Sequence, residues 1–179
     1  CIIQDKLGFI WVGTDKGGLN RLNPSTNKFE RFIHSALNQN SISGNSINSL
    51  WEGTDNSIWI GVWGGGVNKF NYENNTFEIY KSDPLISPTI FSNDINTVYL
   101  DRTGVLWIGS YGGGLYKFNT NLSPFKHYKR NPLDKNHLSN DLIISILKDK
   151  DGVLWIGTWG GGLNKMDPIS KSFTSFKNN

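Results

Sequence analysis

The sequence lacks the features of disulfide-bonded, membrane-spanning and nucleic-acid-binding chains. Its single cysteine, Cys1, excludes an internal disulfide bond. No apolar run reaches the roughly 18 residues of a membrane-spanning helix, and no signal peptide is recognisable, so we expect no membrane contact within the chain. Lys and Arg residues are scattered, at a formal net charge of +3, rather than gathered in the basic stripe that nucleic acid requires. We therefore expect no nucleic-acid partner.

Residues typical of catalytic and metal sites are also scarce. The three histidines, His34, His127 and His137, show no spacing with cysteine or aspartate that indicates zinc. Segment 149–152 (Asp-Lys-Asp-Gly) is similar to part of a calcium loop, but it lacks the distal glutamate, so a turn is the preferred interpretation. No Ser/His/Asp set stands out. The sequence therefore predicts no catalytic residue, no metal and no cofactor.

What the sequence does contain is a repeat. Trp11, Trp59, Trp107 and Trp155 follow one another at intervals of 48 residues, so the same unit is written four times without a net insertion or deletion. A fixed period of roughly 20 to 50 residues is typical of repeat architectures, in which no unit can bury its apolar face alone. We therefore interpret residues 1–179 as a single array of four units.

Each unit predicts four short strands. Hydrophobic residues make up only 37% of the chain, whereas it contains 20 glycines and 13% aromatic residues, a composition that favours strands joined by tight turns. In the second unit the predicted strands are Ile47–Leu50, Ile58–Gly61, Val67–Phe70 and the segment from Phe77 to Tyr80. Asp-x-x-Gly turns and Gly-Gly-Gly turns separate them in the clearest units. No stretch shows a sustained helical period.

The second strand of each unit determines the expected architecture. Trp59 and its neighbours Ile58 and Ile60 are apolar on both sides of the strand, so both sides must be covered. Radially stacked four-stranded sheets provide this cover, with the tryptophan wedged between neighbours. The sequence thus predicts an all-β fold, a β-propeller with four-stranded antiparallel blades. The blades are expected at about 1–36, 37–84, 85–132 and 133–179.

The repeated motif resembles a known family. Residues 101–115 and 149–163 read Asp-x-x-Gly-x-x-Trp-Ile-Gly-x-x-Gly-Gly-Gly-Leu, which is similar to the two-component regulator propeller repeat. The resemblance implies an extracytoplasmic (periplasmic or extracellular) sensor region of a bacterial hybrid two-component histidine kinase, with a glycan as the favoured ligand class. Units one and two depart from the motif at Asp15-Lys16 and at Gly53 and Asn56.

The number of blades leaves three ways to complete a ring. The chain holds four units and no spare strand to interlock the first blade with the last. It is a portion of a larger ring, or it pairs with a second copy, or it closes alone. An open array exposes an apolar blade face at each end. Other propeller blades or a second copy of the chain are therefore expected partners.

One rim of the propeller carries the candidate ligand site. Hairpin order places the glycine-rich turns and the junctions between units on this rim. The aromatic residues Trp63, Tyr111 and Trp159 precede the Gly-Gly-Gly turns, and Asp15 takes their place in unit one. Aromatic faces beside polar groups suit sugar rings. The expected polar neighbours are Asn45, Asn93 and Asn140 at the junctions. The alternative is that the rings only cover the glycines of the next blade.

The function predicted from the sequence is non-catalytic ligand sensing, with a glycan or other small ligand on the glycine-rich rim. One alternative is a structural or protein-binding propeller, because fold does not fix function. Another is a propeller enzyme, since the Asp-x-x-Gly-x-x-Trp string is distantly similar to quinoprotein repeats and to the sialidase Asp-box. A sialidase needs an arginine cluster, and arginine occurs only at Arg21, Arg31, Arg102 and Arg130.

Overall fold

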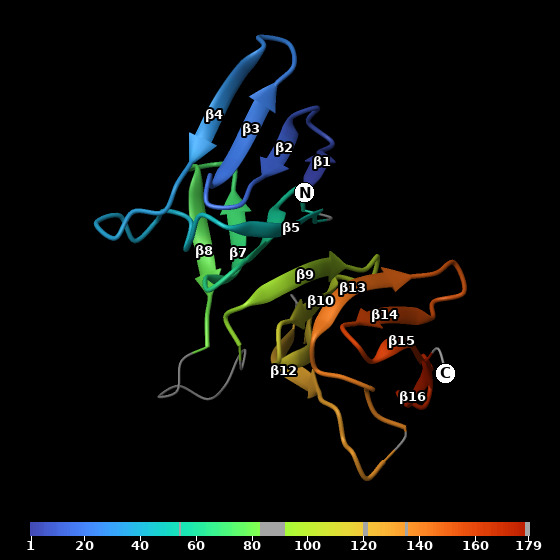
Figure 1. Ribbon diagram of the computed structural model, residues 1–179. Helices are drawn as coiled ribbons and strands as arrows, with labels where there is room; N and C mark the ends of the chain where they lie inside the picture. Colours follow the sequence, from blue (N-terminus) through green and yellow to red (C-terminus); the bar gives the residue numbers. More distant parts are fainter. Residues whose placement is uncertain (54, 83–91, 120–121, 135, 178–179) are drawn as a thin grey trace.

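The computed structural model describes residues 1–53, 55–82, 92–119, 122–134 and 136–177. Within these ranges the chain forms four sheets and no helix (Figure 1). Each sheet is an antiparallel meander of four consecutive strands, so the predicted all-β fold with four-stranded antiparallel blades is confirmed. The strands are β1 (Ile2–Gln4), β2 (Ile10–Gly13), β3 (Leu19–Asn23) and β4 (Lys28–Phe32) in blade 1, β5 (Ile47–Glu52), β6 (Ile58–Val62), β7 (Gly66–Asn71) and β8 (Thr76–Tyr80) in blade 2, β9 (Ile95–Leu100), β10 (Val105–Ser110), β11 (Gly114–Asn119) and β12 (Leu122–Tyr128) in blade 3, and β13 (Ile143–Lys148), β14 (Leu154–Thr158), β15 (Gly162–Met166) and β16 (Phe173–Phe176) in blade 4.

The first strand of each blade is the innermost. Strand β5 contacts β9, and β9 contacts β13, so consecutive blades touch along these strands (Figure 1). The chain then moves outward through each sheet and crosses to the next blade by a junction loop. This arrangement places the glycine-rich turns and the junctions on one rim, where the Gly66 amide donates to the Asn93 carbonyl at 2.9 Å. The Asp-x-x-Gly turns lie on the other rim.

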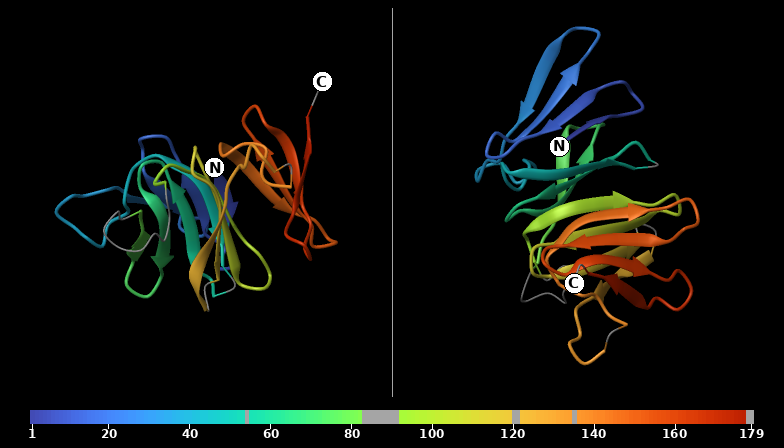
Figure 2. Two further views of the ribbon diagram at one scale, coloured as in Figure 1. Left: turned by 90° about the horizontal axis from the view of Figure 1, so that it is seen from below. Right: turned by 45° about the vertical axis from the view of Figure 1, so that its right-hand side comes forward.

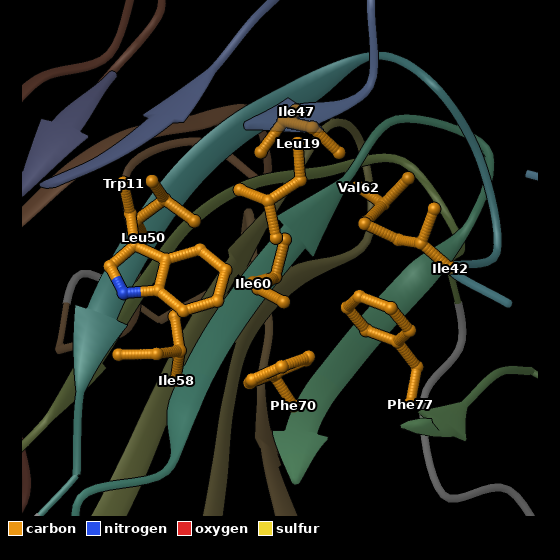
Figure 3. Close-up of a cluster of buried hydrophobic side chains, with 10 residues drawn as sticks. All are labelled: Trp11, Leu19, Ile42, Ile47, Leu50, Ile58, Ile60, Val62, Phe70 and Phe77. Carbon is orange, nitrogen blue, oxygen red and sulfur yellow. The ribbon is translucent and has the colours of Figure 1, made fainter. Parts of the chain in front are cut away.

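The tryptophan of strand two packs between blades, as predicted. Trp11 belongs to a buried cluster that otherwise consists largely of residues from blade 2, including Ile58 and Phe70 (Figure 3). Trp59 and Trp107 occupy the same place toward blades 3 and 4. Burial of these side chains removes a large apolar area from water, which is the main stabilising contribution. The cores of the molecule therefore lie between the sheets.

A glycine two residues after Trp11, Trp59 and Trp107 lets each of these blades approach the next one closely. A Cβ atom on Gly61 would lie 2.9 Å from Cγ2 of Ile95, the first residue of the next inner strand. Gly13 faces Ile47 in the same way, and Gly109 faces Ile143. Side chains at these places would push neighbouring blades apart. The repeated glycine is therefore required by packing.

A second contact joins the inner strands through a bulge. The pairing of β5 with β6 and of β9 with β10 skips Asn48 and Asn96, so that each is a bulge residue. Asn48 Nδ2 donates to the Ile95 carbonyl at 2.9 Å, and Asn96 Nδ2 donates to the Ile143 carbonyl at 2.7 Å. Blades 2 and 3 thus each hold the next blade by a side-chain hydrogen bond from this place. Blade 4 carries Ile144 at this place, which has no donor to offer.

The two ends of the array expose blade faces that are buried elsewhere. In blade 4, Leu163 is exposed although its equivalents Leu19, Val67 and Leu115 are buried, and Trp155 is half-buried. The opposite face of blade 1 exposes its own apolar side chains, among them Ile2 and Phe29. The four blades form an open arc with the first and last sheets apart (Figure 2). In this structure the four blades therefore do not close into a ring.

Candidate functional site

Glycine-rich turns build the rim that carries the candidate site. Within the turn of blade 2, Gly64 adopts a φ of 67°, a conformation that suits glycine. A Cβ atom on the next residue, Gly65, would lie 2.5 Å from Cγ1 of Val62, so there is no space for a side chain. In blade 1, Lys16 takes the place of Gly64 with a φ of 59°. These restrictions do not apply to the residue before the turn, where a large side chain fits.

The residue before each glycine-rich turn of blades 2, 3 and 4 is one of the three predicted aromatic residues, and its side chain is exposed to solvent. Trp63 is 44% exposed, Tyr111 is 50% exposed and Trp159 is 69% exposed. Their backbone amides donate to carbonyls of the junction before the same blade, as in the 2.8 Å bond from Tyr111 to Asp94. The rings of Trp63 and Tyr111 meet with centroids 5.4 Å apart and planes tilted by 57°. The rim therefore carries an aromatic surface on a rigid backbone.

Asp15 lies at the equivalent place in blade 1 and is tied to the next junction. The hydroxyl of Ser46 donates to Oδ1 of Asp15 at 2.8 Å, and the Lys16 amide donates to the same hydroxyl at 3.2 Å. Blade 2 repeats the link, because the Gly64 amide donates to Oδ1 of Asp94 at 3.1 Å. The carboxylates of Asp15 and Asp94 therefore place acceptors beside the aromatic surface.

The predicted asparagines differ in what their side chains do. Oδ1 of Asn45 accepts from the His34 amide, and Oδ1 of Asn93 accepts from the Ser82 amide, both at 2.8 Å. These two asparagines therefore hold the ends of their own junction loops. Asn140 lies at the rim beside Trp159, whose carbonyl accepts from its Nδ2 at 2.9 Å.

The structural equivalent of Asn45 and Asn93 in blade 4 is Asp141, one residue beyond Asn140. Its Oδ1 accepts from the Arg130 amide at 2.6 Å. The spacing of 48 residues from Asn93 was the signal that could have identified Asp141 from the sequence.

A buried asparagine behind the rim was not anticipated from the sequence. Asn68 is fully buried, and its Oδ1 accepts from the Ser43 amide at 2.9 Å while its Nδ2 donates to the Ser43 hydroxyl at 2.7 Å. Asn164 and Ser139 form the same pair in blade 4. Buried polar groups that are paired in this way fix a unique loop position. The recurrence of asparagine at 68 and 164 was the available signal.

On the opposite rim the aspartates are occupied by backbone and tryptophan N–H groups. Oδ1 of Asp149 accepts from the amides of Asp151 and Val153, and Oδ2 accepts from Trp155 Nε1 at 2.8 Å. This segment is therefore a turn, as predicted. Among the residues that the structure describes, no group of three or more His, Cys, Asp or Glu side chains is placed to hold a metal ion.

Asp101 makes the same turn and adds an ion pair. Its carboxylate accepts from the Thr103 hydroxyl and from Lys148 Nζ of blade 4, the latter at 2.9 Å. Burial alone would raise the pKa of Asp101, but the hydrogen bonds from Thr103, Lys148 and Val105 outweigh burial and lower this pKa to about 2. The ionised carboxylate thus links blades 3 and 4.

We expect this link to weaken in acid. Because the pKa of Asp101 is lower in the folded chain than its ordinary value of 3.8, its contribution to stability is complete above pH 4 and is lost as the pH falls toward 2. The expected loss is about 1–2 kcal/mol of unfolding free energy, since solvent screening reduces the effect. Urea unfolding between pH 5 and pH 2 measures it. The Asp101→Asn variant should show a flatter dependence on pH, and identical curves for both proteins would contradict the assignment.

Known proteins provide a comparison for this geometry. The family described as two component regulator propeller matches residues 89–112 and 137–160. The extracellular domain of a putative hybrid two component system from B. thetaiotaomicron is 27% identical with a TM-score of 0.84, and the match covers 99% of this chain and 24% of that one. A second such domain from this organism is 22% identical with a TM-score of 0.80, covering 98% and 24% of the two chains. No curated protein matches the chain.

A further solved structure supports the fold alone. PorZ of Porphyromonas gingivalis, a surface component of the type-IX secretion system, is 18% identical with a TM-score of 0.70, covering 99% of this chain and 27% of that one. The chain therefore spans about a quarter of the length of each of these three structures. In the part of the chain that the structure describes, no helix has the length and apolar character needed to cross a membrane. Residues 89–112 in blade 3 and 137–160 in blade 4 thus match the two-component regulator propeller family, as the sequence resemblance predicted.

Proposed function

We propose that the chain is a non-catalytic ligand-recognition segment in the extracytoplasmic sensor region of a two-component signalling protein. The likeness to the extracellular domain of a hybrid two component system supports this role, because it extends along 99% of the chain at 27% identity. In such a sensor the ligand must bind two arrangements of the protein with different affinity in order to shift their populations. The rim loops are suited to recognition because a rigid scaffold carries them.

The favoured ligand is a glycan bound on the glycine-rich rim. The observation that carries this proposal is the exposed aromatic series, in which the rings of Trp63 and Tyr111 lie 5.4 Å apart. Sugar rings pack their C–H faces on aromatic surfaces, and their hydroxyl groups need polar partners. The carboxylates of Asp15 and Asp94 and the amide of Asn140 lie at the same rim.

The test is the double variant Trp63→Ala with Trp159→Ala. A glycan array with neutral oligosaccharides identifies a ligand, and calorimetry then measures its affinity. We expect the double variant to lose binding by at least tenfold, about 1.4 kcal/mol, while the fold survives because both rings are exposed. The matched control is Trp51→Ala, which removes an exposed tryptophan from an inner strand, where it packs on Tyr99. Equal affinity for the double variant and the native chain would refute the rim as the site.

Completion of the ring is proposed to involve further blades rather than closure of these four. Each blade in the chain offers its tryptophan face to the next, and blade 4 offers the same face, with Trp155 and Leu163, to solvent. A face that is buried three times within one chain is a suitable docking surface for another blade of the same kind. The partner is a flanking repeat or a repeat of a second copy.

A further inference from the structure

A groove of about 590 Å³ lies where the outer edge of blade 3 meets the outer edge of blade 4. One wall is the end of β12 with the junction loop that follows it, and the other wall is the segment before β16. The groove includes the rings of Tyr128 and Phe173, which meet edge to face at 5.6 Å. Its size is in the range of small-ligand sites.

The walls of this groove are cationic. Lys129, Arg130 and Lys171 supply the positive charge, and no Asp or Glu is among its described lining residues. Hydroxyl groups of Ser170 and Ser172 and side-chain amides of Asn131 and Asn136 lie between the charges.

Three carboxylates contact residues of the groove without being part of its lining, and one of them is Asp167, whose Oδ1 accepts from the Ser170 hydroxyl at 2.9 Å. Asp134 pairs with His137 Nδ1 at 3.0 Å, and Asp141 accepts from the Arg130 amide. The lining itself thus offers three basic side chains and several hydrogen-bonding groups to one ligand.

The repeat supplies an internal comparison for this groove. The junction loops before blades 2 and 4 are held alike, since the Phe77 amide donates to the Asn40 carbonyl as the Phe173 amide does to the Asn136 carbonyl. Ninety-six residues earlier, the places of Lys129, Arg130, His137 and Lys171 are taken by Ile33, His34, Ser41 and Asn75. The scaffold therefore does not require cations at these places.

Lys171 stands at a position whose backbone conformation favours asparagine over lysine. Its φ is 60°, in the left-handed region, where the equivalent residues Asn27 and Asn75 have φ values of 53° and 54°. Asparagine adopts this region more readily than lysine does. The Lys171 ammonium donates to the Pro168 carbonyl at the same turn. A lysine at a place that suits asparagine adds positive charge to the groove at a conformational cost.

We propose that this groove is an anion subsite that binds the carboxylate or sulfate group of an acidic oligosaccharide. The choice of a saccharide rests on the proposed function, whereas the charge selectivity rests on the groove alone. Fixed cations attract an anion and orient it, and the serine and asparagine side chains can bond to its hydroxyl groups. The rim would then bind the neutral part of a ligand and the groove its charged part.

The experiment measures binding of a galacturonic acid trisaccharide to the full chain by calorimetry. Three further probes are the neutral galactose trisaccharide, sodium sulfate and a short single-stranded oligonucleotide. The test variant combines Lys129→Gln, Arg130→Gln and Lys171→Asn, the last being the residue that blade 2 carries. The control variant combines Lys28→Gln, Lys81→Gln and Lys177→Gln, which removes the same charge from exposed places outside the groove.

We expect the acidic trisaccharide to bind more tightly than the neutral one and the test variant to lose at least tenfold in affinity, with the control unchanged. Added salt should weaken this binding, because the charges are partly exposed. Equal loss in both variants, or equal binding of the oligonucleotide, would overturn the proposal by showing nonselective attraction. Binding of sulfate alone would retain the anion site and overturn its saccharide ligand. The double variant Trp63→Ala, Trp159→Ala distinguishes the two proposals. If it binds the acidic trisaccharide as the native chain does, the rim is not part of the site, and the groove proposal still stands.

Discussion

Replacement of Trp11 by alanine is expected to lower the free energy of unfolding by about 3–5 kcal/mol. Trp11 is 0% exposed and packs edge-on against Phe70 of blade 2 with ring centroids 5.0 Å apart. Its Nε1 donates to Oδ2 of Asp5 at 2.7 Å, so the variant also removes a donor from a buried carboxylate. Urea unfolding followed by circular dichroism measures the loss. A loss below about 1 kcal/mol would show that the interface between blades 1 and 2 contributes little.

Trp155→Ala is the matched comparison, because Trp155 occupies the same place in blade 4. Its ring faces solvent on one side and meets Phe176 at 6.1 Å, with no further blade beyond it. The expected loss is about 1 kcal/mol, since little apolar area is removed from the folded state. Light scattering must accompany this measurement, because a chain of 20.1 kDa that associates would cover Trp155. Equal losses for both variants in a monomer would contradict the open arc.

Gly109→Ala is expected to destabilise the chain by about 1–3 kcal/mol through a steric conflict between blades. The new Cβ atom would lie 2.7 Å from Cγ2 of Thr97 and closer still to Cγ2 of Ile143 in blade 4. Neither neighbour can move far, because Ile143 is buried at the start of an inner strand. Thermal unfolding and the same urea titration measure the effect.

Gly157→Ala provides the control for this prediction. The glycine is equivalent to Gly109, and its new Cβ atom would meet only Ser145 of its own strand pair, with Oγ at 2.5 Å. That hydroxyl can rotate away, so we expect a change below about 0.5 kcal/mol. If Gly157→Ala destabilised the chain as much as Gly109→Ala, the conflict would lie within a blade and not between blades.

Much of the fold could be predicted from the sequence because the same pattern occurs four times. A tryptophan strand that is apolar on both sides must be covered on both sides, and the positions of Trp11 and Trp59 in the structure follow from that requirement. The exposed aromatic residue before each Gly-Gly-Gly turn could also be predicted, since the glycines form the turn and the preceding residue can carry a large side chain.

The polar contacts between blades could not be predicted in the same way. Asn48 and Asn96 reach the next blade only because a bulge turns them out of the strand pairing, and no periodic pattern indicates a bulge. Asn140 was chosen as the partner of Asn45 and Asn93, although Asp141 makes the equivalent bond. The residue type, asparagine, pointed to Asn140, whereas the hydrogen bond in the structure identifies Asp141 as the equivalent residue.

The cationic groove also could not be predicted from the sequence. Lys129 and Lys171 are 42 residues apart, and they share one groove only because the outer edges of blades 3 and 4 come together. Composition alone indicated scattered charge. Local clustering of charge in a repeat protein depends on which loops cross the blade boundary, and this depends on tertiary packing.

The asparagine bonds from β5 to β9 and from β9 to β13 give the array a direction that has a consequence during biosynthesis. The N-terminal blade leaves the ribosome first, and its tryptophan face and glycine are then already in place for the next blade. Blade 2 can dock on blade 1 through Trp11. Asn48 of blade 2 can then donate to the Ile95 carbonyl once blade 3 has been made. We expect such a chain to fold blade by blade as it emerges, since each step needs only the neighbour made just before it.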